Sequence, residues 1–108
     1  MYTEDNLNAV KTIILQEMTD VEIIWLFGSY AKNKANQNSD LDIAIVVSNK
    51  KDWRKRKCIM TNLYRKTSGI GLMVDFLLKD IASFEKEKRL PTISRIVERE
   101  GRIIWTKN

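Results

Sequence analysis

Three short runs of apolar residues constrain the fold of this 108-residue chain more than any other feature. The runs span residues 21–27, 40–47 and 71–78, and their β-branched and aromatic side chains predict a strand over each. Apolar residues fill most positions rather than every second one, which is typical of strands covered on both faces. We therefore predict an α/β fold in which a small mixed sheet is flanked by helices.

Amphipathic segments outside these runs predict the helices that cover the sheet. The first spans about residues 3–19, and the second spans 51–67 and ends at Gly69. In the first segment the apolar stripe consists of Leu7, Val10, Ile14 and Met18. In the second segment the side chains predicted to face the core are Trp53, Met60, Leu63 and Tyr64.

The C-terminal part predicts one more helix and a short edge strand. Pro91 suits the first turn of this helix, and Gly101 suits its end. Residues 102–105 then favour a strand at the edge of the sheet. With a short helix after Gly28, the expected order is α, β, α, β, α, β, α, β, and residues 1–108 are predicted to form one domain. The last helix is expected to direct inward Ile93, Ile96 and Val97.

Residue types that are absent or rare exclude several kinds of chemistry. The chain has no histidine, which excludes Ser-His-Asp and Cys-His nucleophile systems and HExxH zinc sites. Its one cysteine, Cys58, cannot form an internal disulfide and fits a reducing compartment. The N-terminal residues are acidic and polar, and no apolar stretch has the length of a membrane span, so the predicted location is cytoplasmic.

Charge is distributed unevenly along the chain, whose formal net charge is +5. Residues 1–49 carry three Lys or Arg and seven Asp or Glu, whereas residues 50–78 carry eight and two. The basic cluster within 50–57 is interpreted as the solvated face of a helix, with contact to RNA or to an acidic protein as the alternative. Trp53 and Trp105 are interpreted as packing or interface residues and not as a platform for base stacking.

The most informative motif joins the end of the first predicted strand to the start of the second. Gly28-Ser29 is followed by ten residues and then by Asp40-Leu41-Asp42. Side chains alternate along a strand, so Asp40 and Asp42 are expected on the same side, where their charges repel. A cation would neutralise them, and carboxylate oxygens without histidine or thiolate partners favour Mg²⁺ or Mn²⁺. The motif therefore predicts a metal site.

Two further features extend this site. Asp75 lies in the middle of the third predicted strand, where an ionised carboxylate is costly unless it is paired or metal-bound. If the third strand lies beside the second, the three acids can meet. Gly28 permits a tight turn, and the start of the following helix, with the Ser29 hydroxyl, offers donors to a phosphate. Lys32 lies one turn further on, near enough to contact that phosphate, although a lysine there is more often solvated.

These residues resemble the motif of the minimal nucleotidyltransferase family of the DNA polymerase beta superfamily, and the resemblance covers nearly the whole chain. It implies that Asp40, Asp42 and Asp75 are the catalytic residues and bind two Mg²⁺ ions, and that Asp75 can also accept a proton. Relatives often have glycine where this chain has Asn33, but asparagine tolerates a left-handed backbone better than most residues. The resemblance further implies that a nucleoside triphosphate is held by Gly28 and Ser29.

The same resemblance implies an activity and a partner. Members of the family transfer a nucleoside monophosphate, here expected to be AMP from ATP, to a hydroxyl group. They commonly work with a small helical HEPN-domain protein, as antitoxins that silence a ribonuclease toxin by adenylylating one of its tyrosines. The present chain is too short to hold much of an acceptor site, so a partner chain is expected.

Three alternatives compete with this interpretation. Asp75 could form a structural ion pair with a base from residues 51–66. The chain could be a catalytically weak or inactive binding module that neutralises a partner by contact alone. It could also be a basic nucleic-acid-binding domain that uses residues 50–66, in which case binding would depend steeply on salt and would not need the acids.

Overall fold

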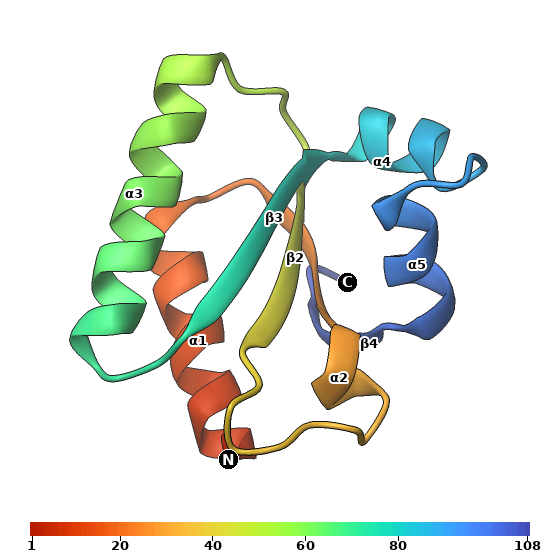
Figure 1. Ribbon diagram of the computed structural model, residues 1–108. Coiled ribbons are helices and arrows are strands. Elements are labelled where there is room, and N and C mark those ends of the chain that lie inside the picture. The colour runs from red at the N-terminus through yellow and green to blue at the C-terminus, as the bar shows by residue number, and fades with distance from the viewer.

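A four-stranded mixed sheet forms the centre of the computed structural model, which describes residues 1–108 (Figure 1). The strand order is β3-β2-β1-β4. Strands β1 (Val21–Phe27) and β2 (Leu41–Val47) are antiparallel, and β2 is parallel to β3 (Val74–Asp80). Strand β4 (Arg102–Thr106) pairs with β1 at the other edge. The predicted mixed sheet and its C-terminal edge strand are thereby confirmed.

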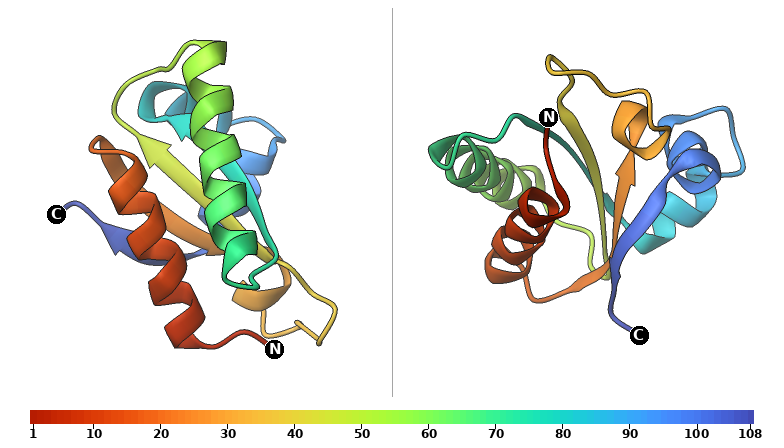
Figure 2. Two further views of the ribbon diagram at one scale, coloured as in Figure 1. Left: turned by 90° about the vertical axis from the view of Figure 1, so that its left-hand side faces the viewer. Right: turned by 90° about the horizontal axis from the view of Figure 1, so that it is seen from below.

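Helices cover both faces of this sheet (Figure 2). Helices α1 (Glu4–Glu17) and α3 (Trp53–Gly69) lie side by side on one face. Helices α4 (Ile81–Glu87) and α5 (Ile93–Glu100) lie on the other. The short α2 (Gly28–Ala31) follows β1 directly. Helix α3 is the crossover that the parallel pair of β2 and β3 requires, because parallel neighbours cannot be joined by a tight hairpin.

Each face of the sheet has its own hydrophobic core. The larger core, beneath α1 and α3, contains 17 buried residues, among them Ile24, Leu41, Ile43, Leu63 and Phe76. The smaller core, beneath α4 and α5, contains Phe27, Ala44, Val46, Phe84 and Val97. Because side chains alternate along a strand, the residue between Leu41 and Ile43 projects toward the α4 and α5 side. The same holds for the residue between Val74 and Phe76. These two residues are Asp42 and Asp75.

Local sequence signals set most of the element boundaries. Thr3 begins α1 with a capping box, in which its hydroxyl accepts from the Asn6 N–H and the Asn6 side chain accepts from the Thr3 N–H. Asp52 begins α3 by accepting from the Lys55 N–H at 2.8 Å. Strand β3 begins three residues later than predicted, because Gly71 has a φ of +79° and belongs to the preceding turn. No helix has both the length and the apolar character needed to cross a bilayer.

The predicted orientation of α3 is partly wrong. The side chains that face the sheet are Ile59, Leu63 and Thr67, one helical turn apart. Leu63 was predicted to do so, and Met60 packs against the same core as predicted. Trp53, however, is 70% exposed, and Tyr64 lies at the margin of the core, 39% exposed with its ring against Phe76. At about 100° per residue, Trp53 lies about 120° around the helix from Ile59, so it cannot share the buried stripe. The Thr67 hydroxyl is satisfied inside the helix by donating to the Leu63 carbonyl at 2.8 Å.

The last third of the chain also differs from the prediction. Helix α4 was not predicted, although Asp80 caps it by accepting from the Ser83 N–H at 3.0 Å. Pro91 precedes α5 instead of lying in its first turn, and Gly101 ends α5 as predicted. Within α5, Val97 is buried as predicted, but Ile93 and Ile96 are about half exposed, so their predicted inward orientation is wrong. A helix of eight residues presents only a narrow stripe to the sheet, and Ser94 and Val97 fill it.

The orientation of α5 can be tested with a pair of alanine substitutions. Val97→Ala removes two methyl groups from the smaller core and should lower the free energy of unfolding by about 2 kcal/mol. Ile96→Ala trims a side chain that is 48% exposed and should change it by less than about 0.5 kcal/mol. Urea unfolding of the two variants measures the difference, and a larger effect at Ile96 would contradict the observed orientation.

Candidate active site

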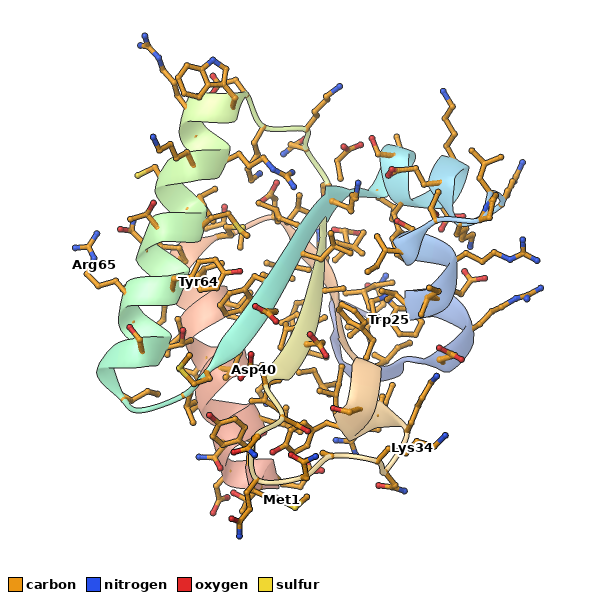
Figure 3. All side chains as sticks on the ribbon, viewed as in Figure 1. Met1, Trp25, Lys34, Asp40, Tyr64 and Arg65 are labelled. Carbon is orange, nitrogen blue, oxygen red and sulfur yellow. The ribbon has the colours of Figure 1, made fainter.

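Two of the three predicted acids lie in one row with the end of β1, and the third lies just before this row. In the strand register, Phe27 of β1 is opposite Asp42 of β2, and Asp42 is opposite Asp75 of β3. Gly28 follows Phe27 directly and therefore lies at the same level of the sheet. Asp40 lies where the chain enters β2, beside the beginning of β3 (Figure 3). The sheet thus brings together acids that are separated by 35 residues in sequence.

The environments of the three carboxylates differ. Asp42 is half-buried on the central strand β2, whereas Asp40 and Asp75 are exposed. The prediction placed Asp75 in a buried strand, where its charge would be costly, and this is wrong because β3 is an edge strand. Of the three carboxylates, Asp42 is therefore the one that is partly removed from water. No ion pair joins Asp75 to a base of α3, so the alternative of a structural ion pair is not supported.

Electrostatic repulsion is concentrated on Asp42. Burial raises the pKa of its carboxyl above the ordinary value, and the charges of Asp75 and Asp40 raise this pKa further. The three acids are therefore close enough to interact. As they lie, no group of three acidic, histidine or cysteine side chains is close enough to hold one ion jointly. The donor set nevertheless fits a hard divalent cation, because it consists of carboxylate oxygens alone.

Gly28 is required next to Asp42 for two reasons. Its φ is +70°, a backbone conformation that residues with a side chain rarely adopt. A Cβ atom at this position would also fall on the Asp42 carboxylate. The backbone of the Gly28-Ser29 turn can therefore approach the acid more closely than any other residue would permit.

A backbone hydrogen bond and a left-handed residue define the turn after Gly28. The Lys34 N–H donates to the Ser29 carbonyl at 2.9 Å, and Asn33 between them has a φ of +57°. Asn33 thus adopts the left-handed backbone that asparagine was expected to tolerate here. Lys32, predicted to contact phosphate, instead forms an ion pair with Glu100 of α5 at 3.0 Å. The structure thus places Lys32 beside α5 and shows no contact between it and the acids.

Two tyrosine hydroxyls hold the edge strand on either side of Asp75. The Met73 N–H donates to the Tyr2 hydroxyl at 2.9 Å, and the Phe76 N–H donates to the Tyr64 hydroxyl at 3.0 Å. The Tyr2 N–H in turn donates to the Tyr30 hydroxyl at 3.0 Å, and the two rings stack at 5.9 Å. Tyr2 therefore links the turn after Gly28 to the strand of Asp75. Sequence reasoning missed this connection.

The acids lie on an open surface. None of the cavities in the structure is lined by Asp40, Asp42 or Asp75. The smaller core closes the neighbouring part of the same sheet face, where Trp25 stacks on Phe84 with ring centroids 6.4 Å apart. A substrate at the acids would therefore be bounded by this chain on one side and open to a second molecule on the other.

Comparison with models of known protein families assigns the chain to a family. A family model described as polymerase beta nucleotidyltransferase matches residues 9–108. The chain therefore belongs to the polymerase beta nucleotidyltransferase family, as the motif around Gly28 and Asp40 predicted. Members of this family are enzymes that transfer nucleotides and generally use divalent metal ions.

Individual proteins are similar over different extents. The protein adenylyltransferase MntA of Haemophilus influenzae is 42% identical over 52 residues, which are 48% of this chain and 45% of that protein. The match thus spans about half the length of this curated relative. A Sulfolobus solfataricus protein described as a nucleotidyltransferase has a TM-score of 0.67 at 17% identity, covering 95% of this chain and 79% of that chain. One chain of the complex between the tri-AMPylated Shewanella oneidensis HEPN toxin and the MNT antitoxin has a TM-score of 0.64 at 22% identity, covering 95% and 71%. These two likenesses show a shared fold.

The effect of the close approach of Gly28 to Asp42 can be separated from the effect of its left-handed backbone by three matched substitutions. Gly69→Ala meets open space and an ordinary backbone, so it should be neutral or slightly stabilising. Gly71→Ala meets open space at a positive φ and should cost about 1 kcal/mol of stability. Gly28→Ala adds the clash with the carboxylate and should cost about 1–3 kcal/mol more. Equal losses at Gly28 and Gly71, measured by urea unfolding, would show that the contact with Asp42 is unimportant.

The repulsion on Asp42 predicts the effect of making it neutral. Because its folded-state pKa is raised, ionisation of Asp42 destabilises the metal-free protein. This penalty grows as the pH rises from the ordinary pKa of the acid to its raised folded-state pKa, and it is constant above that range. Asp42→Asn should therefore melt at the same temperature as the wild type or higher at pH 7 in EDTA. The difference should vanish near pH 3, where the wild-type acid is protonated. A variant that unfolds at pH 7 would identify Asp42 as a structural residue.

Proposed function

We propose that this protein is a magnesium-dependent nucleotidyltransferase that transfers AMP from ATP to a tyrosine hydroxyl of a HEPN-type partner, and that it acts as an antitoxin. The observation that carries the proposal is the register of β1, β2 and β3. This register aligns the turn at Gly28 with carboxylates from two further strands. A triphosphate beside such a turn, opposite acids that bind metal, is the arrangement that nucleotidyl transfer requires.

In this proposal the carboxylates of Asp40, Asp42 and Asp75 hold two Mg²⁺ ions. The ions would supply positive charge that neutralises the phosphate oxygens and the acids. Family membership and the all-oxygen donor set support this assignment. The raised pKa of Asp42 supports it too, because burial and the charges of Asp75 and Asp40 raise this pKa and a bound cation would offset both effects.

The Gly28-Ser29 turn would hold the triphosphate, since it lies level with Asp42 and has no side chain at its closest point. Lys32 would join the phosphate by leaving Glu100. Both members of that ion pair are substantially exposed, and exposed pairs contribute little to stability, so the exchange costs little.

The transfer step uses residues of this chain for position and for proton transfer. The acceptor hydroxyl oxygen attacks the α-phosphorus, the bond from that phosphorus to the bridging oxygen breaks, and pyrophosphate leaves. The hydroxyl proton passes to a carboxylate. Asp75 is the best placed to receive it, because it is exposed at the edge of the sheet, where a second molecule can approach.

The choice of acceptor is supported by the similar proteins. The relative from Haemophilus influenzae is named a protein adenylyltransferase, and the HEPN toxin in the Shewanella oneidensis complex is AMPylated. An acceptor supplied by another chain also agrees with acids that lie on an open surface.

Label transfer tests the proposal. The protein is incubated with Mg²⁺, a HEPN-domain protein from the same genome, and each of the four nucleoside triphosphates labelled at the α-phosphate. ATP should label a tyrosine of the HEPN protein. Asp42→Asn should lower the rate at least about 100-fold, because it removes charge stabilisation from the reacting centre. Asp5→Asn, an equal charge change in an exposed residue of α1, is the matched control and should retain full activity.

Two results would count against this reaction. No label on the HEPN protein with any nucleotide would contradict the acceptor. Inhibition of the HEPN protein that persists in Asp42→Asn without label would favour the binding module that acts by contact alone.

A further inference from the structure

The outer face of α3 combines unpaired positive charge with an exposed tryptophan. We propose that this surface, which consists of Trp53, Arg54, Lys57 and Arg65, binds single-stranded nucleic acid. The proposal concerns a part of the molecule that the transfer reaction does not use.

The positive charge of this region is largely unpaired. Among its neighbours, Lys51 is paired with Asp20, and Lys66 is paired with Glu17. No ion pair involves any of the four consecutive bases in residues 54–57. The only acid within residues 50–66 is Asp52, whose carboxylate caps α3. Clustered cations without acidic partners raise the local potential and attract phosphate.

Trp53 is exposed where the other tryptophans are covered. Its exposed fraction is 70%, whereas Trp25 stacks on Phe84 and Trp105 packs against the larger core. The guanidinium carbon of Arg54 lies over the Trp53 ring, 5.7 Å from its centroid. An aromatic ring with an adjacent cation is the combination on which unpaired bases stack. The interpretation of Trp53 as a packing residue of this chain is therefore wrong, and the alternative of an interface residue stays untested. Its exposed ring can serve as a stacking platform.

These side chains line a common surface. A shallow depression of about 310 Å³ on the outer side of α3 is bordered by Trp53, Arg54, Lys57 and Arg65. Figure 3 shows Arg65 projecting from α3 away from the sheet. Trp53 and Arg65 are twelve positions apart on one helix, about 18 Å at a rise of 1.5 Å per residue. The surface is therefore long enough to contact several nucleotides, with Trp53 at one end and cations along its length.

The location of this surface separates it from the acids. Helix α3 covers the sheet face opposite to α4 and α5 (Figure 2), and Asp42 and Asp75 project on the α4 and α5 side. Because the sheet lies between them, phosphates bound at α3 would not contact the carboxylates. A strand of nucleic acid at α3 would leave the acids free for a nucleotide.

The composition of the surface favours nucleic acid over an acidic protein. The central part of a protein interface is usually depleted of charged residues and rich in apolar contacts. Here Trp53 is flanked by Arg54 and Lys57, and the only other hydrophobic residue that borders the depression is Cys58. Phosphate and base stacking match such a surface better than a protein partner does.

Binding of a fluorescein-labelled 12-nucleotide oligouridylate, followed by anisotropy in EDTA, tests the inference in the intact protein. Affinity should fall with salt, with a slope of log K against log salt of about −2, as expected for three phosphate contacts. Trp53→Ala should weaken binding about 5- to 100-fold, and Trp53→Phe should retain most of the affinity, because a ring remains for stacking.

A matched pair of charge variants locates the site. Arg54→Gln with Lys57→Gln should lower the salt slope by about 1.4. Arg95→Gln with Arg99→Gln removes the same charge from α5, on the opposite side of the sheet, and should leave the slope unchanged. Equal effects of the two pairs would show binding by overall charge and would overturn the site. So would the absence of binding, or tight binding of poly-glutamate that competes with the oligonucleotide and is insensitive to Trp53→Ala. None of these measurements needs ATP, metal or transfer activity, so they do not depend on the proposed reaction.

Discussion

The register that sets Phe27, Asp42 and Asp75 side by side is the constraint on which the rest of the structure depends. It requires β1 to end where β2 begins, so the turn at Gly28 meets the acid of the next strand. It also requires β2 and β3 to be parallel, and their connection must then return over the length of the sheet, which α3 does. Slipping any of these strands by one residue would move its acid to the opposite face.

The carboxylates of the site repel one another in the metal-free protein, and this repulsion lowers its stability. Asp42 is half-buried beside two like charges, and Gly28 adopts against it a left-handed backbone that glycine tolerates without strain. The edge strand that carries Asp75 is stabilised from outside the sheet by the hydroxyls of Tyr2 and Tyr64. Rigid support around carboxylates that repel each other is typical of functional sites.

Residue type and spacing predicted those parts of the fold and the site that depend on neighbouring residues in the sequence. The strands, the acids and the turn at Gly28 follow from residue type and spacing, and Asn33 adopts the left-handed backbone that its place in the motif implied. Prediction failed where an apolar residue was taken to be buried, at Trp53 and Ile96, because helix phase depends on the sheet it covers. The bond from Met73 to Tyr2 joins residues 71 positions apart, and no local pattern signals it.

The larger hydrophobic core and the acids lie on opposite faces of the sheet. The face beneath α1 and α3 buries 17 residues in its core, whereas the face that carries the acids buries five. Hydrophobic burial is the main source of stability, so most of it resides on the side remote from the acids. Substitutions around α4 and α5 should therefore lower the free energy of unfolding less than substitutions in the larger core do. Such a fold can change what it recognises near its acids over evolutionary time while its larger core remains the same.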